Sequence, residues 1–487
     1  MKRGAHLLIA AMLVLAPALF GSKGNTYASD TMNAPTAKQL IPLRNEAWGG
    51  FYWFSNGRGG PYGKAHDQDQ RATVFSNPSQ TLDVRGGWHD AGDYGKYSVN
   101  TAHSVSLLLL TALHAEEVLP EKIRPVVIYD KNLPDWQNLI LHPLLWLLRM
   151  QSEEGGVYHK AATPEFAPMG AKPADDTVVK FVMPVSSTAT AHFSAVMALA
   201  TLALHDTSYA KGFSEAGDLA DKWLSKNTSL AMPNEKYGKH SYGGAYHDTD
   251  DSDERLFAAA ARAVLSARSE HIRRSVDWLL SRKIMISQKG HALSWREVDV
   301  QAAWTLKLGE KLMSPSQKKA LDEVLQSFDN HYQGKFDGSS LNIAHGDKDQ
   351  FQWGFNGHLA AVGWHNLMVE KLIKPSGQTP FGLAQLNWFL GKNPLKRQFV
   401  TGAQNGRIKA PHFRPWSSGA VDLPQGLLVG GPNSGPHYGD PILEKLQSAP
   451  PAQRHGDDVK SYATNEVAIN WQAAWAAYLA LAAAAVK

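Results

Sequence analysis

Residues 467–486 read VAINWQAAWAAYLALAAAAV, a run that would be apolar on nearly every side of a helix. A surface helix usually has one apolar stripe and one polar face, whereas a helix that is apolar all round is buried. The run is short for a membrane span, and the polar residues Asn470 and Gln472 stand near its start. We therefore expect a core helix that other elements cover on all sides.

Helical periodicity dominates the remaining chain, and alternating strand patterns are few and short. Helices rich in apolar residues are expected near 104–119, 139–151, 189–204, 256–268 and 358–373, and Pro143 should kink its helix unless the helix begins there. This pattern predicts an all-α protein with paired helices in one large domain, and a barrel of about twelve helices would use the length. A solenoid of helical repeats is the alternative, but we find no repeat of roughly 34 to 45 residues.

The composition narrows the class of protein. The chain has 487 residues, no cysteine, a net charge of +4 and 43% hydrophobic residues. A substantial core can form from such a composition, so disorder is not expected. Because Lys and Arg are spread along the chain without a basic block, we expect no nucleic-acid partner.

The first 28 residues resemble a leader for export. Lys2 and Arg3 precede an apolar stretch at 7–20, and Thr26 and Ala28 are small residues at the expected cleavage positions. A membrane anchor is the alternative, but the apolar run is about 14 residues long, which is short for a span. We predict a signal peptide at 1–28, a mature domain at 29–487, secretion or periplasmic location, and no membrane attachment after cleavage.

Residues 86–97, GGWHDAGDYGKY, form a segment that we call the DAGD loop. It places Asp90 and Asp93 three residues apart among glycines and aromatics, just before a helical run. Taken alone, such a pair is typical of turns and helix caps. The functional interpretation is a pair of carboxylates of which one accepts a proton and the other orients the group that loses it.

Glu466 lies in a second acidic stretch, DDVKSYATNEVAINW at 457–471. A glutamate in a first helical turn can simply favour the helix dipole, by roughly 0.3–1 kcal/mol. To act as an acid near neutral pH it would need a raised pKa, which burial against Tyr462 or Trp471 would supply.

Several stretches together resemble glycoside hydrolase family 9, the inverting endoglucanase family. GGWHDAGDYGKY and YATNEVAIN resemble the family's two catalytic motifs, and KAPHFRPW at 409–416 matches a third block. WFLGKNPLKRQFVTG, GLLVGGPNSGPHYGDP, GGVYHK, PVSSTATAHFSAVMA and DDSDERLFAAAA resemble further blocks of the family. The resemblance covers nearly everything after residue 45 and implies an (α/α)6 barrel.

The resemblance also implies roles for individual residues. Asp93 matches the general base, Asp90 the residue that helps to hold the attacking water, and Glu466 the general acid. An inverting glycosidase needs its acid and base roughly 6.5–9.5 Å apart, with the water between base and sugar. His412 and Arg414 match residues that contact the sugar near the cleavage point, although a His-x-Arg pair alone is equally typical of a surface loop.

Aromatic side chains are the other candidates for substrate binding, because a flat sugar face stacks on such rings. The candidates are Trp88, Tyr246, Trp295, Trp353 and Tyr462. Plain core packing is the alternative interpretation for Tyr246, Trp295 and Trp353.

Metals are expected to be structural if they bind at all, since the chemistry requires no cofactor. The acidic run HDTDDSDE at 247–254 lacks EF-hand spacing, and a solvated helix N-terminus is the simpler interpretation. The resemblance favours calcium on Asp253 and Glu254, with Asp250 as a further ligand. Some relatives carry a Cys/His zinc site before the DAGD loop, but a thiolate site cannot form without cysteine, so we predict no zinc.

We therefore predict a monomeric, secreted inverting endo-β-1,4-glucanase that acts on cellulose or soluble β-glucans. Within the same chemistry, the alternative is an exo-acting β-glucosidase, cellobiohydrolase or glucosaminidase, which a loop at 152–185 would favour if it blocks one end of the cleft. From other classes, the alternatives are an inactive glycan-binding protein and a helical-repeat interaction protein. The intact carboxylates Asp90, Asp93 and Glu466 argue against loss of activity.

Overall fold

The computed structural model describes residues 34–486 except for 58, 233–239, 283–292 and 378. The leader predicted at residues 1–28 lies outside the described residues. Within the described ranges, none of the helices has the length and apolar character that crossing a membrane requires.

The longer helices follow one another with short connections or long loops. They are α1 (Ala37–Gly49), α2 (Ser98–Ala115), α3 (Asp135–Arg149), α4 (Ser187–Ala203), α5 (Tyr209–Lys226), α6 (Ser252–Ser266), α7 (Ser269–Ser281), α9 (Asp299–Leu308), α10 (Pro315–Asp337), α11 (Phe355–Leu372) and α17 (Ile469–Ala485). Shorter helices are α12 (Phe381–Ala384), α13 (Leu386–Phe389), α14 (Arg414–Ser417), α15 (Pro441–Lys445) and α16 (Tyr462–Asn465). Single 3-10 turns occur at Gly50–Phe54, Asp67–Arg71, Glu116–Val118, Glu310–Leu312 and Pro451–Gln453.

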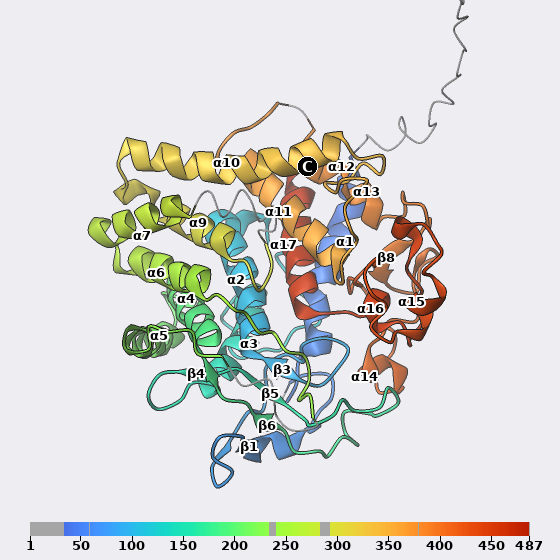
Figure 1. The fold of residues 1–487 in the computed structure, drawn as a ribbon, viewed down its shortest axis with the longest axis horizontal. Coiled ribbons are helices and arrows are strands. Elements are labelled where there is room, and N and C mark those ends of the chain that lie inside the picture. The colour runs from blue at the N-terminus through green and yellow to red at the C-terminus, as the bar shows by residue number, and fades with distance from the viewer. Residues whose placement is uncertain (1–33, 58, 233–239, 283–292, 378, 487) are drawn as a thin grey trace, which may run out of the picture.

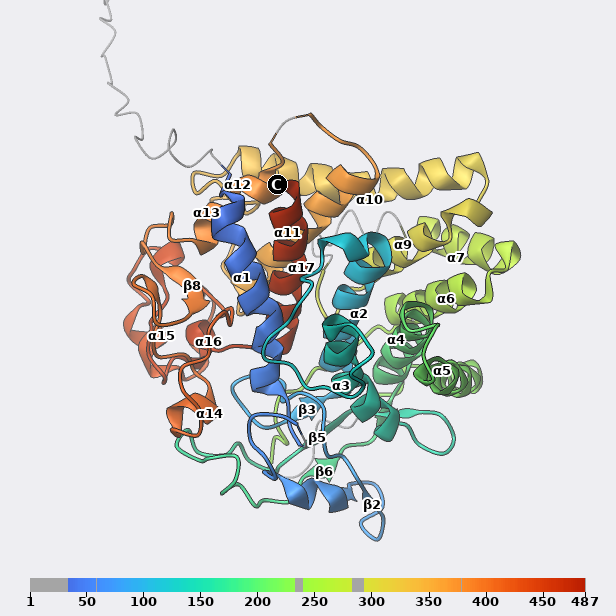
Figure 2. The same cartoon turned by 180° about the vertical axis from the view of Figure 1, so that it is seen from behind.

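The helices form two concentric rings. In the inner ring α2 packs on α4, α4 on α6, α6 on α9, and α11 on α17, while α17 returns to α2. The helix α10 buries only part of its surface and contacts α9 and α11 from outside this ring. In the outer ring α1 packs on α17, α3 on α2, α5 on α4, and α7 on α6. In both ribbon views α2 and α17 stand side by side, with α1 beside α17 (Figure 1, Figure 2). The (α/α)6 barrel that the sequence predicts is therefore confirmed.

The inner helices are buried because their sequences offer apolar or small residues on every side. Trp475 and Tyr478 of α17 are fully buried, and α2 buries nearly all of its residues. Alanines let neighbouring helices approach α17 closely, so the chain needs no polar face there. The helix predicted from residues 467–486 is confirmed as part of the core.

Most of the short strands lie in the lower part of Figure 1. The largest sheet has the order β2-β1-β6-β5-β3, with β2 (Thr81–Leu82), β1 (Ala72–Val74), β6 (Phe181–Val182), β5 (Lys160–Ala162) and β3 (Lys96–Tyr97). β1 and β6 are parallel, and the other pairs in this sheet are antiparallel. Two-stranded pairs are β4 (Val157–Tyr158) with β7 (Val185–Ser186), and β8 (Gln398–Thr401) with β9 (Arg407–Ile408). Since β3 directly follows Gly95, this sheet supports the end of the DAGD loop.

One local expectation, that the helix around Pro143 could begin at this proline, needs correction. The helix α3 begins at Asp135, directly after Pro134, and continues through Pro143, so Pro143 does not mark its start. Burial of the flanking Leu141 and Leu144 in the core holds this helix together despite the missing amide donor.

We expect Gly363→Ala to lower the free energy of unfolding by about 1–3 kcal/mol, the usual cost of overpacking a core. A Cβ at Gly363 in α11 would lie 2.3 Å from the Tyr478 ring of α17. Gly334→Ala in α10 is the matched control: Gly334 is exposed with open space around it, so alanine should stabilise the helix by roughly 0.5–1 kcal/mol. Urea unfolding followed by circular dichroism measures both; a Gly363→Ala protein as stable as the parent would contradict the packing.

Candidate active site

The DAGD loop and the start of α17 meet at one end of the barrel. The Ile469 amide donates a hydrogen bond to the Asp90 carbonyl at 2.9 Å, and His412 pairs with Glu466 through a parallel β-bridge. A Cβ added at Gly92 would lie 3.1 Å from Glu466 Oε1 and 2.4 Å from the His412 carbonyl oxygen. The backbone at Gly92 therefore touches the Glu466 segment, and no side chain fits between them.

Asp90 is held by two side-chain donors. Asn100 donates to Oδ1 and the Tyr246 hydroxyl donates to Oδ2, each at 2.7 Å. Burial, and then the charge of Asp93, raise the pKa of Asp90 above its ordinary value, while the two hydrogen bonds act in the opposite direction. A neighbouring negative charge favours the protonated form of a carboxyl, so Asp90 keeps its proton to a higher pH than an ordinary aspartate.

Asp93 is fixed from within its own turn. The Gly95 amide donates to Asp93 Oδ2 at 3.1 Å and the Tyr97 hydroxyl donates to the same oxygen at 3.2 Å. Tyr97 belongs to β3, so the sheet sets the direction of the carboxylate. Burial and the charge of Asp93 raise the pKa of Tyr97 well above its ordinary value, which keeps this hydroxyl a donor.

The Glu466 side chain is half-buried, and protein groups surround its carboxyl. Burial, followed by the charge of Asp93, raises the pKa of Glu466 well above its ordinary value, and Arg414 opposes this shift. A carboxyl with such a pKa keeps its proton at pH values where an ordinary glutamate has lost it. The predicted meeting of carboxylates from the two ends of the chain is thus present in the structure.

His412 and Arg414 lie beside this group of carboxylates but are engaged with the protein. His412 Nδ1 donates to the Val459 carbonyl at 2.6 Å, and burial lowers the pKa of His412 to about 4, so the ring is neutral. Arg414 Nε donates to the Ala167 carbonyl at 2.6 Å and Nη1 donates to the Gly92 carbonyl at 2.8 Å. Arg414 therefore ties the loop after β5 to the DAGD loop.

The predicted aromatic residues divide into two groups. Trp88 is 1% exposed and stacks on Phe51, so the structure places it in the core with almost no ring face open to a sugar. Tyr246 and Trp295 contact each other edge to face, with ring centres 5.0 Å apart. Trp353 is 39% exposed and lies 5.8 Å from the Tyr462 ring.

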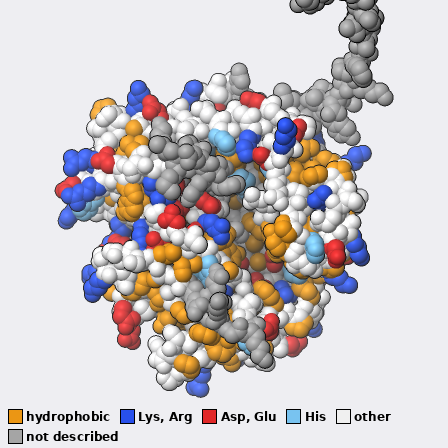
Figure 3. All heavy atoms as spheres, viewed as in Figure 1, with side chains coloured by type: hydrophobic (Ala, Val, Ile, Leu, Met, Phe, Trp, Pro, Cys, Tyr) orange, Lys and Arg blue, Asp and Glu red, His pale blue; other side chains and the backbone are white. Residues whose placement is uncertain are grey.

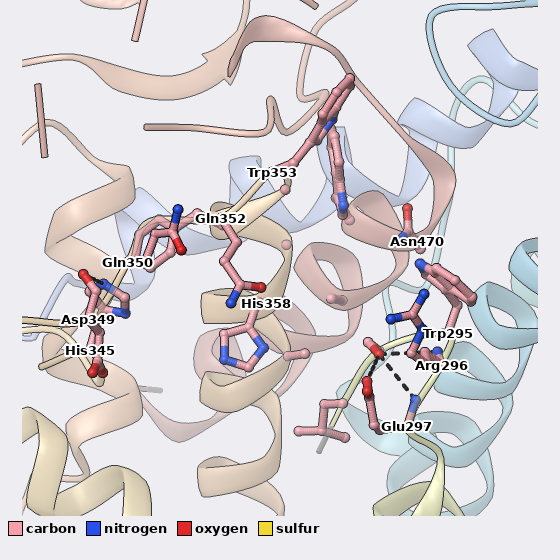
Figure 4. Close-up of a pocket in the computed structure, with 18 of the residues that line it drawn as sticks. Trp295, Arg296, Glu297, His345, Asp349, Gln350, Gln352, Trp353, His358 and Asn470 are labelled. Carbon is pink, nitrogen blue, oxygen red and sulfur yellow. Dashed lines mark hydrogen bonds between the residues drawn. The ribbon is translucent and has the colours of Figure 1, made fainter. Parts of the chain in front are cut away.

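A cavity of about 1090 Å³ opens beside the first turn of α17, and Asp90, Asp93 and Glu466 are not among the residues that line it. Its lining includes Trp295, Trp353 and Asn470, and the surface view shows a hollow with hydrophobic side chains near the centre of this face (Figure 3). In the close-up, Trp295 and Trp353 lie on opposite sides of Asn470 (Figure 4). Asn470 belongs to the first turn of α17, four residues after Glu466. Trp295 also touches Tyr246, which binds Asp90, so the cavity borders the carboxylates through aromatic rings.

The acidic run at 247–254 fits a cation only in part. Glu254 is fully buried, and neither of its carboxylate oxygens has a hydrogen-bond partner among the described residues. Asp253 accepts the Val298 amide at 2.9 Å and lies 3.9 Å from the Arg282 guanidinium, while Asp250 accepts the Ser252 amide. In the described part of the chain, no three acidic or histidine side chains gather as a metal site. The orphaned Glu254 carboxylate is the one feature that a cation would satisfy.

Asn100 and Tyr97 belong to this site although the sequence did not single them out as site residues. Asn100 is one of several buried polar residues of α2, and no local pattern separates it from its polar neighbours in the sequence. Tyr97 stands at the end of the DAGD loop, and nothing in the sequence alone marks its hydroxyl as a donor to Asp93.

Comparisons with known proteins agree with this geometry. The family model described as glycosyl hydrolase family 9 matches residues 54–479. A cellodextrinase of Butyrivibrio fibrisolvens is 30% identical over 423 residues, which cover 82% of this chain and 75% of the relative. Endoglucanase D of Acetivibrio thermocellus is 27% identical over 431 residues, which cover 85% of this chain but 63% of the relative.

Solved structures show the same fold. A thermostable endoglucanase from Alicyclobacillus acidocaldarius superposes with a TM-score of 0.78 at 28% identity, covering 91% of this chain and 84% of that chain. The structure of AaCel9A in complex with a cellobiose-like isofagomine superposes with a TM-score of 0.79, with the same identity and coverage.

We expect Tyr246→Phe to raise the pKa of Asp90 further, by roughly one to two units, because a hydrogen bond to a charged group contributes about 1.5–3 kcal/mol and 1.36 kcal/mol corresponds to about one unit. Titration of protein labelled with carboxyl-¹³C aspartate, read as the difference from Asp90→Asn, measures the shift. Tyr94→Phe is the control, because the Tyr94 hydroxyl donates to the Ala171 carbonyl. An unchanged Asp90 titration in Tyr246→Phe would show that this hydrogen bond does not stabilise the carboxylate.

Proposed function

Because the chain belongs to glycosyl hydrolase family 9 and is a glycoside hydrolase, we propose that it acts as a secreted or periplasmic inverting endo-β-1,4-glucanase on cellulose or soluble β-glucans. The observation that carries this proposal is the junction at Gly92, where Glu466 comes against the loop that bears Asp90 and Asp93. The cellodextrinase and endoglucanase relatives support a β-1,4-linked glucan as the substrate.

Glu466 is the proposed general acid. Its raised pKa keeps a proton on the carboxyl, which it donates to the glycosidic oxygen as the bond to the anomeric carbon breaks. Activity should fall as the pH rises through this raised pKa, because the deprotonated form has no proton to give.

Asp93 is the proposed general base, and Asp90 helps to hold the water. Asp93 accepts a proton from the water whose oxygen attacks the anomeric carbon from the face opposite the leaving group, so the product has the inverted configuration. The Tyr97 and Gly95 hydrogen bonds fix one Asp93 oxygen, which orients the carboxylate toward its task.

The aromatic cavity is the proposed binding site for the glucan chain. Trp295 and Trp353 offer rings on which sugars stack, and Tyr462 lies beside Trp353. We keep His412 as a contact to the sugar near the cleavage point, while Arg414 acts through its bonds to the two loops.

One observation favours an exo-acting enzyme as the second candidate. The segment after β5 is fastened against the DAGD loop, since Ala167 accepts from Arg414, Met169 accepts from Ser417, and Ala171 accepts from Tyr94 at 2.7 Å. A wall at this position would limit the enzyme to chain ends. Products from reduced, labelled cello-oligosaccharides separate the two candidates: several internal cuts indicate an endo enzyme, and one small product indicates an exo enzyme.

We expect the kcat values of Glu466→Gln and Asp93→Asn to depend differently on the leaving group of the substrate. Both variants should lose about 10²–10⁴-fold in kcat on cello-oligosaccharides. On a cellobioside with an activated aryl leaving group, Glu466→Gln should recover much of its rate, because the leaving oxygen needs no proton, whereas Asp93→Asn should stay inactive. Steady-state kinetics on both substrates measure this; equal rates of Asp93→Asn and the parent enzyme would defeat the mechanism.

A structural calcium ion is proposed at Glu254 and Asp253, with Asp250 as a further ligand, because Glu254 is a fully buried carboxylate with no hydrogen-bond partner among the residues that the structure describes. A ligand that binds only the folded state at 100 times its Kd stabilises by about 2.7 kcal/mol. Calcium should therefore raise the unfolding temperature of the parent protein and not that of Glu254→Gln. Glu323→Gln, at an exposed position on α10, is the control. If neither calcium nor a chelator changes the unfolding temperature of the parent protein, the proposed site is contradicted.

We also propose that a leader at residues 1–28 directs export and that the protein is a monomer. The basic residues Lys2 and Arg3, followed by the apolar stretch at 7–20, support export. A mature protein that still begins at residue 1 after expression in a secreting host would contradict cleavage, and sedimentation would reveal a dimer.

A further inference from the structure

Lys96 is a fully buried lysine whose ammonium is completely satisfied. It donates to Asp69 Oδ2 at 2.8 Å, to the Gly86 carbonyl at 3.2 Å, and to the Val84 carbonyl. An ammonium has three N–H donors, so these three acceptors use them all.

The acceptors of Lys96 lie at the two ends of one segment. Val84 and Gly86 stand where the chain enters the DAGD loop, and Lys96 stands where the chain leaves it into β3. The ammonium therefore closes the segment 84–96 into a ring that contains both Asp90 and Asp93. Asp69 adds a second link, since its carbonyl accepts the Val84 amide at 2.8 Å.

We propose that Lys96 is a positioning residue for catalysis: its ammonium joins the entry and exit of the DAGD loop and so fixes the carboxylates between them. This inference rests on the proposed function, because it presumes that Asp93 needs an exact place relative to the sugar. Lys96 contacts neither substrate nor water in this role and acts through the loop.

A general role in stability is the rival explanation, and Lys180 offers the matched control. Lys180 is equally buried and donates to both oxygens of Asp69, at 2.8 and 3.1 Å. Its ammonium bonds only to Asp69 among the described residues, whereas that of Lys96 also bonds the loop. Loss of either lysine removes one buried ion pair, but only the loss of Lys96 opens the loop.

The charge balance favours folding of both variants. Asp69 carries one negative charge against two lysines, so Lys96→Met leaves the Asp69–Lys180 pair and Lys180→Met leaves the Asp69–Lys96 pair. Neither change leaves Asp69 as a buried, unpaired charge, which is the costly case.

The experiment compares kcat and KM on cellohexaose, well below the unfolding temperature, for the parent, Lys96→Met, Lys96→Gln and Lys180→Met. Misplacing a catalytic group by about 1 Å costs about 10²-fold. We expect kcat of Lys96→Met to fall by about that factor with KM little changed, as for a loss felt only in the transition state. Lys96→Gln, whose amide can still donate to the carbonyls, should be intermediate, and Lys180→Met should keep the parent kcat. Unfolding temperatures of all four proteins are measured alongside.

Three results would overturn the inference: equal losses of kcat in Lys96→Met and Lys180→Met, no loss in either, or failure of both Lys96 variants to fold while Lys180→Met folds. A parent protein that does not hydrolyse cellohexaose or any β-glucan refutes the proposed function itself, and the comparison of the lysine variants then has no basis. The two failures are thus distinguishable.

Discussion

The contact between the DAGD loop and the start of α17 is the constraint on which the site depends. The Ile469 amide binds the Asp90 carbonyl, and Gly92 leaves no room for a side chain beside Glu466. Residues almost 400 positions apart in the sequence meet there because the barrel closes, with α17 packed against both α2 and α11. A rigid ring of buried helices thus sets the relative positions of groups carried on loops, which is how a scaffold usually positions a site.

Such a meeting of carboxylates costs stability, and the protein offsets the cost locally. Glu466 and Asp90 both have raised pKa values because burial and neighbouring negative charge disfavour ionisation. In the folded state such groups hold protons that the unfolded chain would release, so their contribution to stability falls as the pH rises from the ordinary toward the raised pKa. Asn100 and Tyr246 donate hydrogen bonds to Asp90. Lys96, which also binds Asp69, holds the two ends of the DAGD loop together.

Sequence reasoning succeeded where a local pattern implied a global requirement. The apolar character of residues 467–486 on all sides demanded surrounding helices, and the inner ring supplies them. The motifs that bear Asp90, Asp93 and Glu466 were specific enough to predict that these groups would meet.

The rest depended on contacts that no local pattern contains. Trp88 stands in the motif yet faces Phe51 in the core, because the side of a loop that faces outward is decided by what packs beneath it. The guanidinium of Arg414 binds the Gly92 and Ala167 carbonyls, one of them in a loop about 250 residues away, and neither bond can be predicted from the His-x-Arg pattern. Lys96 reads as an ordinary polar residue in sequence, and only the fold reveals its acceptors.

The most direct test of the central claim is proton NMR of fresh products released from cellohexaose, recorded before the anomers equilibrate. If Asp93 activates water on one face of the sugar while Glu466 protonates the oxygen on the other, the first signal to grow is that of the α-anomer, and the β-anomer follows by mutarotation. Initial release of the β-anomer would contradict single-step displacement by water between these two carboxylates, and no release of product would contradict the hydrolase itself.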